Sequence, residues 1–398
     1  MARTQEAQAA RPERRALKLP VKRKTQVQRL HSNIDWFFAG ILLVLLTIGT
    51  IFIYSASYVF AKHNYGSSYF FINKQLGWVI FSLVVLFSIV RYFDYLILKK
   101  FSYLAFFISY LLLISVYFFG EVRNGAKRWL DLVVFDLQPS EIVKFTVILV
   151  IATYVVWLDN KGKDLNRTVK YGIAPFAVLG VSVAIPLILQ PHLSATIIIL
   201  LMIFFLMFLS GVKGAYLRNA AIIAMALVLV IVLFTSHGQA RIDAWLHPEN
   251  DTQGSGWQPL QSIYAVGSGG LWGVGFGASK QKHLYLPEPQ NDYIFAIICE
   301  EMGFMFAVVI IILFMLLIWR GFCIAKKAPS KFSSLLVMGI ISQVGIQVLL
   351  NIGVVTGTLP STGVSLPFFS YGGSSLVILM AEMGVVLNIS KYSYSEKV

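Results

Sequence analysis

Long apolar runs recur along this chain from residue 34 to residue 390, and they limit what it can fold into. About 20 mostly apolar helical residues cross the roughly 30 Å of bilayer hydrocarbon. The runs are unbroken, whereas a barrel would show short alternating segments. Charged residues make up only 13% of the 398 residues, against about 25% in soluble domains. The sequence therefore predicts an all-α integral membrane protein without a separate soluble catalytic domain.

Ten of these runs are interpreted as membrane spans. They cover residues 34–59, 76–93, 101–120, 140–157, 172–189, 193–211, 218–236, 293–319, 333–358 and 374–390. With a cytoplasmic N-terminus, the inside segments hold most of the Lys and Arg residues, as the positive-inside rule requires. Both termini are then cytoplasmic. The longest loop, residues 237–292, is extracellular and lies between the seventh and eighth spans.

The predicted organisation is one membrane domain with two tails. Residues 1–33 form a basic, disordered cytoplasmic tail, which either lies near anionic lipid or only fixes the topology. Residues 34–390 form the ten-span domain, and residues 391–398 form a second cytoplasmic tail. The first apolar run starts too late and is too long for a cleaved signal peptide. Two cysteines in or beside one span predict no disulfide framework.

The outer loop from Glu121 to Glu141 is unusually basic for its predicted side of the membrane. Its Arg123, Lys127 and Arg128 are interpreted either as a cationic grip for a phosphate or diphosphate, or as charges neutralised by nearby acids. Charge alone does not decide between these readings. The loop leads into a predicted helix start at residues 138–141, where Glu141 and Lys144 share a helix face and can pair. The pair is either a structural ion pair or part of a polar cavity wall.

Four carboxylates occur in residues 285–301, of which Glu300 and Glu301 lie inside an apolar run. Each would cost about 2.5 to 3.5 kcal/mol at the bilayer centre without a partner. At 100° per residue, Glu300 lies about 80° from Asp292 and Glu301 about 180° from it. We therefore expect Glu300 to line the same cavity as Asp292, and Glu301 to pair with another helix. Asp292 itself is either a helix N-cap or a functional acid.

Two further outer segments are rich in glycine. Residues 256–282 can dip into the membrane interface, with glycines making turns where backbone lines a cavity. Their G-x-G spacing is no dinucleotide motif, since no strand precedes it. Residues 357–376 are predicted to form a compact hairpin between the last two spans, with Phe368, Phe369 and Tyr371 as interface anchors.

Several motifs follow one another in a fixed order. They are NGAKRW (124–129), QPSE with Lys144, Gln258 with Gln261 and Ser262, GGLWGVGFG followed by QK (269–282), YLPEPQNDYIF (285–295), EEMG (300–303) and LPSTGVSLPFFSYGGSS (359–375). Together they resemble the SEDS family of shape, elongation, division and sporulation proteins, and the division (FtsW) and sporulation (SpoVE) branch more than the elongation (RodA) branch. His192 stands where many relatives carry Asp, and Thr362 where some carry Lys, so an acid role at position 192 does not transfer; His192 is expected to cap a turn.

The resemblance implies a ten-span glycosyltransferase of the bacterial inner membrane that polymerises lipid II into peptidoglycan during cell division. The expected partners are lipid II, a class B penicillin-binding protein and other divisome membrane proteins at the septum, with no nucleic acid. No cofactor is implied, except for a divalent cation, Mg²⁺ or Mn²⁺, held by acidic groups. A lipid II flippase and a non-catalytic division scaffold remain the alternatives.

The resemblance also assigns site residues. Asp292 matches the proposed catalytic aspartate and is expected to act as a general base. Without the resemblance, an N-cap role for it would be favoured. The expected substrate-binding residues are Lys127, Arg128, Glu141, Lys144, Gln258, Gln261, Ser262, Lys282, Glu288, Glu300, Ser370 and Ser374.

Overall fold

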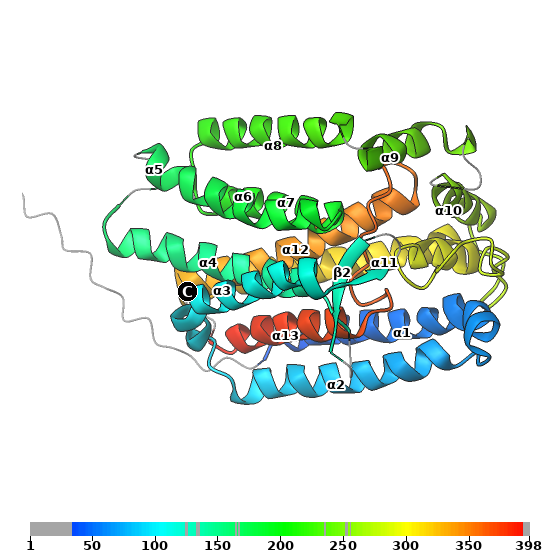
Figure 1. The fold of residues 1–398 in the computed structure, drawn as a ribbon. Coiled ribbons are helices and arrows are strands. Elements are labelled where there is room, and N and C mark those ends of the chain that lie inside the picture. Colours follow the sequence, from blue (N-terminus) through cyan, green and yellow to red (C-terminus); the bar gives the residue numbers. More distant parts are fainter. Residues whose placement is uncertain are drawn as a thin grey trace, which may run out of the picture.

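The computed structural model describes residues 34–392, apart from residues 124–125, 133–135, 164, 166–167, 235, 251–253 and 255. The predicted tail at residues 1–33 lies outside the described residues, as does most of the predicted tail at residues 391–398. Long helices dominate the described part (Figure 1).

Each of the ten apolar runs is helical. The helices are α1 (Trp36–Tyr65), α2 (Phe70–Tyr92), α3 (Leu96–Phe119), α4 (Pro139–Asn160), α6 (Ala174–Leu189), α7 (Leu193–Leu209), α8 (Gly214–Phe234), α11 (Ile294–Lys326), α12 (Lys331–Val355) and α13 (Gly373–Ser390), with the short α5 (Val169–Gly172) before α6. Seven of them are long and apolar enough to cross a membrane, namely α1 to α4 and α11 to α13. The helices α6 and α7 are apolar but shorter. The chain is therefore a multi-pass membrane protein.

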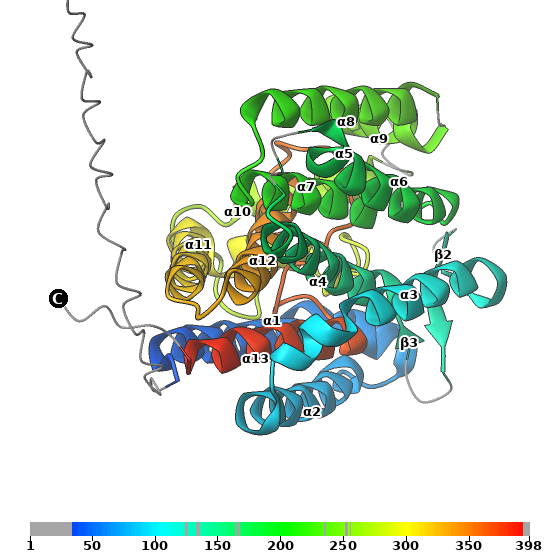
Figure 2. The same cartoon turned by 90° about the vertical axis from the view of Figure 1, so that its left-hand side faces the viewer.

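The helices pack in a bundle whose core follows α4, α12 and α13. Figures 1 and 2 show α1, α2 and α13 along one side, α4 and α12 in the middle, and α7, α8 and α9 on the other side. Close approach of α4 and α12 depends on Gly339, where a Cβ atom would lie 2.3 Å from Ile148 Cγ2. Small residues at such crossings let membrane helices approach closely.

The basic loop between α3 and α4 contains a small antiparallel sheet, which corrects the all-α prediction. Its strands are β1 (Glu121–Arg123), β2 (Ala126–Asp131) and β3 (Asp136–Leu137), in the order β1-β2-β3. Successive side chains of a strand point to opposite faces. Lys127 and Arg128 therefore leave β2 on opposite sides, and the sheet separates two cations that the sequence had grouped together.

The predicted long loop contains α9 (Ser236–Leu246), η1 (Pro248–Asn250), α10 (Trp257–Ser268) and a glycine-rich segment, residues 269–282. This segment packs on α11 where Gly303, with φ 75° and ψ −179°, interrupts the helix. Four backbone hydrogen bonds join the two, in which Val274 N–H donates to Glu300 O (2.9 Å), Gly275 N–H to Glu301 O (2.9 Å), Phe304 N–H to Gly270 O (2.9 Å) and Met305 N–H to Leu271 O (3.2 Å). The break thus leaves these backbone groups paired, as a membrane protein requires.

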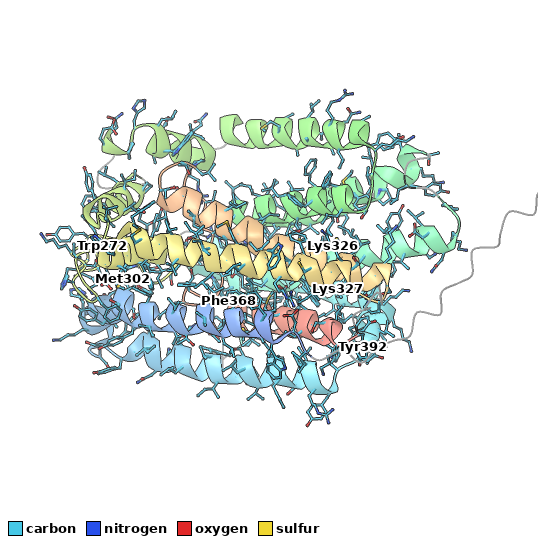
Figure 3. All side chains as sticks on the ribbon, turned by 180° about the vertical axis from the view of Figure 1, so that it is seen from behind. Trp272, Met302, Lys326, Lys327, Phe368 and Tyr392 are labelled. Atoms are coloured by element: carbon cyan, nitrogen blue, oxygen red, sulfur yellow. The ribbon has the colours of Figure 1, made fainter. Side chains whose placement is uncertain are left out.

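The hairpin between α12 and α13 enters the bundle. Phe368 and Phe369 are buried, and Phe368 stacks on Phe314 of α11 with ring centroids 6.5 Å apart. Figure 3 places Phe368 about midway along the molecule, between Trp272 and Met302 at one end and Lys326 and Lys327 at the other. The predicted role of Phe368 and Phe369 as interface anchors is therefore wrong, because both rings pack against protein.

Candidate functional site

The described residues enclose a cavity of about 810 Å³. Its wall combines α2, β2, the starts of α4 and α7, the segment before α11, the middle of α12, the hairpin and the start of α13. Polar side chains from the connecting segments and from the long helices thus face one space. The cavity is the candidate functional site.

Asp292 lines this cavity just before α11. The N-cap of α11 is Tyr293, and the helix start has no side-chain capping bond, so Asp292 does not serve as the N-cap. Its backbone is fixed because Asn351 Nδ2 donates to Asp292 O (2.7 Å) and to Val364 O (2.7 Å). Gly363 faces the carboxylate, where a Cβ atom would lie 3.2 Å from Asp292 Oδ2. The geometry holds the backbone and leaves the carboxylate facing the cavity.

Burial and nearby charges bring the pKa of Asp292 closer to neutral pH. Burial raises its pKa to about 6; Arg128 and Arg241 oppose the rise, and Glu288 adds to it. A carboxylate with a pKa near the working pH accepts a proton readily and still loses it between turnovers. Perturbed acids in clefts are typical of functional sites.

Two arginines accompany Asp292, of which the sequence analysis assigned only one. Arg128 lines the cavity and donates from its Nη2 to Pro191 O (2.8 Å), while its buried Nε has no hydrogen-bond partner among the described residues. Burial lowers the pKa of Arg128, as does nearby Arg241. Arg241 of α9 donates to Ser361 O (3.1 Å) and interacts with Asp292. As a basic residue in a predicted outer segment, Arg241 carried a signal that could have been used.

Lys127 does not belong to the cavity wall. It leaves the other face of β2, and its Nζ donates to Tyr117 O (3.4 Å) at the end of α3. Strand alternation turns Lys127 away from Arg128, so the two predicted cations do not share the cavity, and the predicted substrate contact of Lys127 stays a prediction.

The predicted pairing of Glu141 with Lys144 is confirmed. The Lys144 Nζ to Glu141 Oε2 distance is 2.8 Å, and the Lys144 side chain is only 1% exposed. Both residues line the cavity, beside Gln343 and Gln347 of α12. The pair is at once a structural ion pair and part of a polar wall.

His192 is buried in the cavity wall at the start of α7 and makes no side-chain capping bond. His192 does stand at the predicted cap position, as the N-cap residue of α7, but its side chain does not cap the helix. Burial lowers its pKa to about 3, helped by Arg128, Lys144 and Arg241. The imidazole is consequently neutral at ordinary pH, and its Nδ1 has no hydrogen-bond partner among the described residues. It supplies the cavity with a neutral hydrogen-bonding group.

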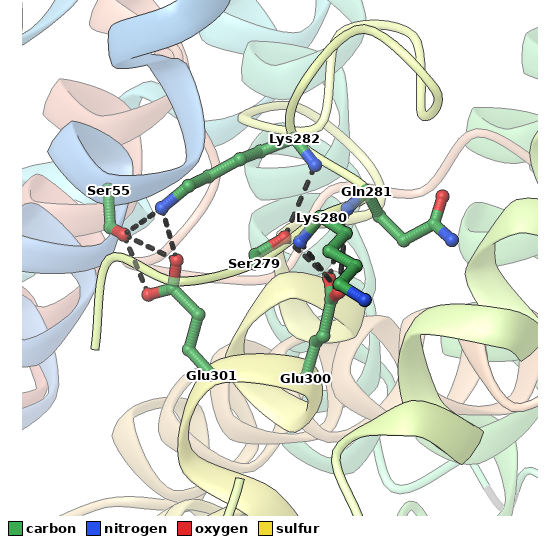
Figure 4. Close-up of polar contacts among 7 residues, drawn as sticks. All are labelled: Ser55, Ser279, Lys280, Gln281, Lys282, Glu300 and Glu301. Carbon is green, nitrogen blue, oxygen red and sulfur yellow. Dashed lines mark hydrogen bonds and ion pairs between the residues drawn. The ribbon is translucent and has the colours of Figure 1, made fainter. Parts of the chain in front are cut away.

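Glu300 and Glu301 form a separate buried network with the glycine-rich segment (Figure 4). Glu300 accepts hydrogen bonds from Ser279 Oγ and from the Lys280 amide (2.8 Å). Glu301 pairs with Lys282 at 2.6 Å and accepts a bond from Ser55 of α1. The predicted contact of Glu301 with another helix is confirmed.

Neither Glu300 nor Lys282 lines the cavity, so the expectation that Glu300 shares it with Asp292 is wrong. The fully buried ammonium of Lys282 is held by Glu301, and its predicted substrate contact stays a prediction. The angular argument for Glu300 assumed that the helix already includes Asp292, whereas α11 begins at Ile294. It also could not foresee the return of residues 279–282 to this face.

The remaining predicted residues divide into two groups. Gln258, Glu288, Ser370 and Ser374 line the cavity. Gln261 and Ser262 do not, because they are buried on the packed face of α10, where Ser262 Oγ donates to Val355 O (2.8 Å). Their expected substrate contacts stay predictions, with both side chains packed away from the cavity.

Sequence reasoning also missed polar residues of the wall. They include Lys74, Gln138, Asn291, Gln343 and Gln347. Gln343 and Gln347 lie four residues apart inside an apolar helix, and this spacing puts them on one face. That pattern was a usable signal.

The donor set does not fit a metal ion held by the protein. No group of three His, Cys, Asp or Glu side chains arranged to hold a metal occurs among the residues that the structure describes. Oxygen-rich sites for Mg²⁺ commonly combine one or two carboxylates with substrate phosphates and water. Metal binding would therefore depend on oxygen atoms brought by a substrate.

Comparison with known proteins gives a consistent result. Residues 35–395 match the family model described as "Cell cycle protein" (FtsW, RodA, SpoVE). Stage V sporulation protein E of Bacillus subtilis is 40% identical over 361 residues, covering 90% of this chain and 97% of that protein. A probable peptidoglycan glycosyltransferase FtsW of Trichlorobacter lovleyi is 35% identical, covering 90% and 93%.

A solved structure shares the fold. It belongs to work on the structural coordination of polymerization and crosslinking by a peptidoglycan synthase complex. The TM-score is 0.74 at 27% identity, covering 90% of this chain and 97% of that chain. The similarity therefore extends over most of the chain.

Proposed function

This chain belongs to the FtsW/RodA/SpoVE family of cell cycle proteins, and we propose that it polymerises lipid II by an inverting transfer with Asp292 as the general base. It is a peptidoglycan glycosyltransferase of cell wall synthesis. The observation that carries the mechanism is the half-buried carboxylate of Asp292, with a pKa of about 6, beside Arg128 in the cavity.

The chemistry follows from the substrates. The growing strand ends in a sugar whose C1 is α-linked to a lipid diphosphate. The 4-hydroxyl oxygen of the incoming lipid II attacks this C1 from the opposite face, forming a β-linkage. The C1–O bond to the diphosphate breaks, and undecaprenyl diphosphate leaves with the electron pair. Asp292 takes the proton of the attacking hydroxyl, a contribution worth about 10² to 10⁴-fold in rate.

The cavity residues divide the remaining tasks. Arg128 stabilises the negative charge that develops on the departing diphosphate, and its unpartnered Nε can donate to a phosphate oxygen. Arg241 keeps positive charge on the same side of Asp292. Neutral His192 and the amide side chains of Gln138 and Gln258 offer hydrogen bonds to sugar hydroxyls.

The proposed topology has ten spans with both termini in the cytoplasm, which places residues 237–292 outside. Seven candidate spans, two shorter apolar helices and α8 support this count. The basic end at Lys326 and Lys327 lies opposite the end with Trp272 (Figure 3). The cavity then opens toward the outer side, where lipid II presents its sugars.

The proposed site of action is the division septum in the bacterial inner membrane, with a class B penicillin-binding protein and other divisome membrane proteins as partners. Relatives named FtsW and SpoVE support the division or sporulation branch. The structure of a synthase complex that coordinates polymerization with crosslinking supports a crosslinking partner.

A divalent cation, Mg²⁺ or Mn²⁺, is proposed only as a companion of the substrate diphosphate. No step of the mechanism is routed through it, because the described residues do not form a metal cage. Titration of polymerisation with EDTA and then with excess Mg²⁺ tests this part alone.

Polymerisation of purified lipid II in liposomes without a membrane gradient tests the function. The protein is supplied with its penicillin-binding partner, whose transpeptidase site is blocked, and the products are separated by chain length. We expect glycan strands of many disaccharides. Transport of labelled lipid II across the bilayer without strand formation would instead support a flippase. Loss of both activities in an intact complex would support a scaffold.

A further inference from the structure

The first turn of α13 forms part of the cavity wall and has the properties of an anion site. Gly372, Gly373, Ser374 and Ser375 all line the cavity. The first backbone N–H groups of a helix have no partner within the helix, and they carry the positive end of its dipole. This turn has no acidic residue and no side-chain cap. Helix starts of this kind bind phosphate groups.

Two side chains of the same cavity support a ligand there. Ser374 is only 6% exposed, and its Oγ has no hydrogen-bond partner among the described residues although it lines the cavity. Lys74 of α2 lines the cavity as well, and its Nζ lies 4.3 Å from the centroid of the Phe70 ring. A buried hydroxyl without a partner is costly. An anion bound here would accept its hydrogen bond and neutralise Lys74.

The helix start is also held rigidly in position. A Cβ atom at residue 373 would lie 2.4 Å from ring atoms of Trp78, so only glycine allows α13 to begin against α2. Tyr371 N–H donates to Gln290 O (2.9 Å), which ties the turn before α13 to the segment that carries Asp292. A rigid anion site at a fixed distance from the proposed base suits a substrate that must be held at both ends.

The two sides of the cavity match the two ends of an acceptor. Arg128 bonds to Pro191 just before α7, and Arg241 lies on α9. Figure 2 shows α7 and α9 on the opposite side of the bundle from α2 and α13. The bond that breaks joins the donor sugar to the donor diphosphate, so the donor diphosphate lies near Asp292. The acceptor's reacting hydroxyl is separated from its own diphosphate by the length of a disaccharide.

We propose that the N-terminus of α13, with Ser374 and Lys74, binds the diphosphate of the acceptor lipid, while Arg128 faces the donor diphosphate. This inference rests on the proposed function for the name of the ligand. The chemistry of the site alone specifies a phosphate or diphosphate group. The site presents the acceptor's 4-hydroxyl to Asp292 from across the cavity.

Binding of lipid II to the complex tests the proposal in an Asp292→Asn background, where turnover is blocked. Native mass spectrometry counts the bound lipids, and titration gives their dissociation constants. We expect two lipid II molecules for Asp292→Asn alone. Adding Ser374→Asp, which places a negative charge at the site, or Lys74→Met should weaken one of them by about tenfold or more, the worth of one charge-assisted hydrogen bond.

A kinetic test uses the wild-type background. Lys74→Met should raise the lipid II concentration for half-maximal polymerisation by about tenfold with little change in the maximal rate. The matched control is Lys62→Met, an exposed lysine near the end of α1 that does not line the cavity. This control should behave as wild type.

Distinct results would overturn the inference. Wild-type affinity for both lipids in the Ser374→Asp and Lys74→Met variants would remove the site. Competition by inorganic diphosphate or phosphatidylglycerol as effective as that by undecaprenyl diphosphate would assign it to free anions or bulk lipid. If the wild type bound two lipids, one of them weakened by Ser374→Asp and Lys74→Met, without forming strands, the site would stand and the proposed polymerase function would fail.

Discussion

Asp292 and the pair Glu300–Glu301 lie within ten residues of one another, yet the structure treats them differently. Glu300 accepts hydrogen bonds from a serine and a backbone amide, and Glu301 is neutralised by Lys282. Asp292 is only half-buried, and its carboxylate faces a cavity with arginines nearby. The carboxylates of Glu300 and Glu301 have their partners inside the protein, whereas the carboxylate of Asp292 faces open space that a ligand can fill.

The difference teaches how to separate structural from functional acids in a membrane protein. A buried charge that is paired and fully hydrogen-bonded has its desolvation cost offset inside the fold. A buried acid with a raised pKa and space in front of it retains that cost, which is compensated when substrate binds or a proton arrives. Substitution of Asp292 should therefore lower the polymerisation rate, whereas substitution in the Glu300–Glu301 network should lower the stability of the fold.

The largest effect is expected from Asp292→Asn. Loss of the general base should lower the polymerisation rate by about 10² to 10⁴-fold. The thermal midpoint of the complex should be kept, because the substitution removes a half-buried charge without removing volume. Strand formation from lipid II checks the predicted fall in rate, and thermal melting of the purified complex checks the predicted stability. Asp243→Asn, an exposed acid on α9, is the matched control. Near-normal polymerisation by Asp292→Asn would remove it from the mechanism.

Lys282→Met should instead damage the fold. Removal of one partner of a buried ion pair leaves an uncompensated charge on Glu301, at a cost of about 3 to 5 kcal/mol. We expect a marked fall in the thermal midpoint and in the yield of folded complex. The double variant Lys282→Met/Glu301→Leu should recover much of this loss, because no charge then remains buried.

The exposed Lys280→Met serves as the control for the ion-pair test, since only its backbone amide bonds to Glu300. A Lys282→Met protein with normal stability and no polymerisation would contradict the comparison, because it would give this lysine a direct functional role.

The sequence predicted the helices well and the site in part. Apolar runs fix which segments are helical, so each predicted span is a helix. The pair Glu141–Lys144 followed from helix periodicity alone. The opposite directions of Lys127 and Arg128 required knowledge that this loop is a strand. The fate of Glu300 depended on a helix break at Gly303 and on a returning loop, both of them tertiary features.

Polymerisation should depend on pH through Asp292. The base works only when ionised, so with its pKa near 6 the rate should fall about tenfold per pH unit below that value. His192, with a pKa of about 3, stays neutral over this range and cannot cause this fall in rate, the acid limb of the pH profile. Stability should move in the opposite sense. Because folding raises the pKa of Asp292, the fold is favoured while the group is protonated, and this contribution is lost as pH rises through about 6.

Initial rates of strand formation between pH 5 and pH 8, with the intact complex verified at each pH, measure this limb. A rate that is flat down to pH 5 would contradict a base with the pKa of Asp292.

The smallest expected effect sharpens the comparison most. Glu288 lines the cavity beside Asp292 and contributes to its raised pKa, although less than burial does. Glu288→Gln should therefore move the acid limb of the pH profile to lower pH by a fraction of a unit while leaving the limb in place. The side chain keeps a hydrogen-bonding group for Asn291, whose Nδ2 bonds to Glu288 Oε2 at 2.9 Å. An unchanged limb would mean that the charge of Glu288 does not reach the base, and burial alone would then set the pKa of Asp292.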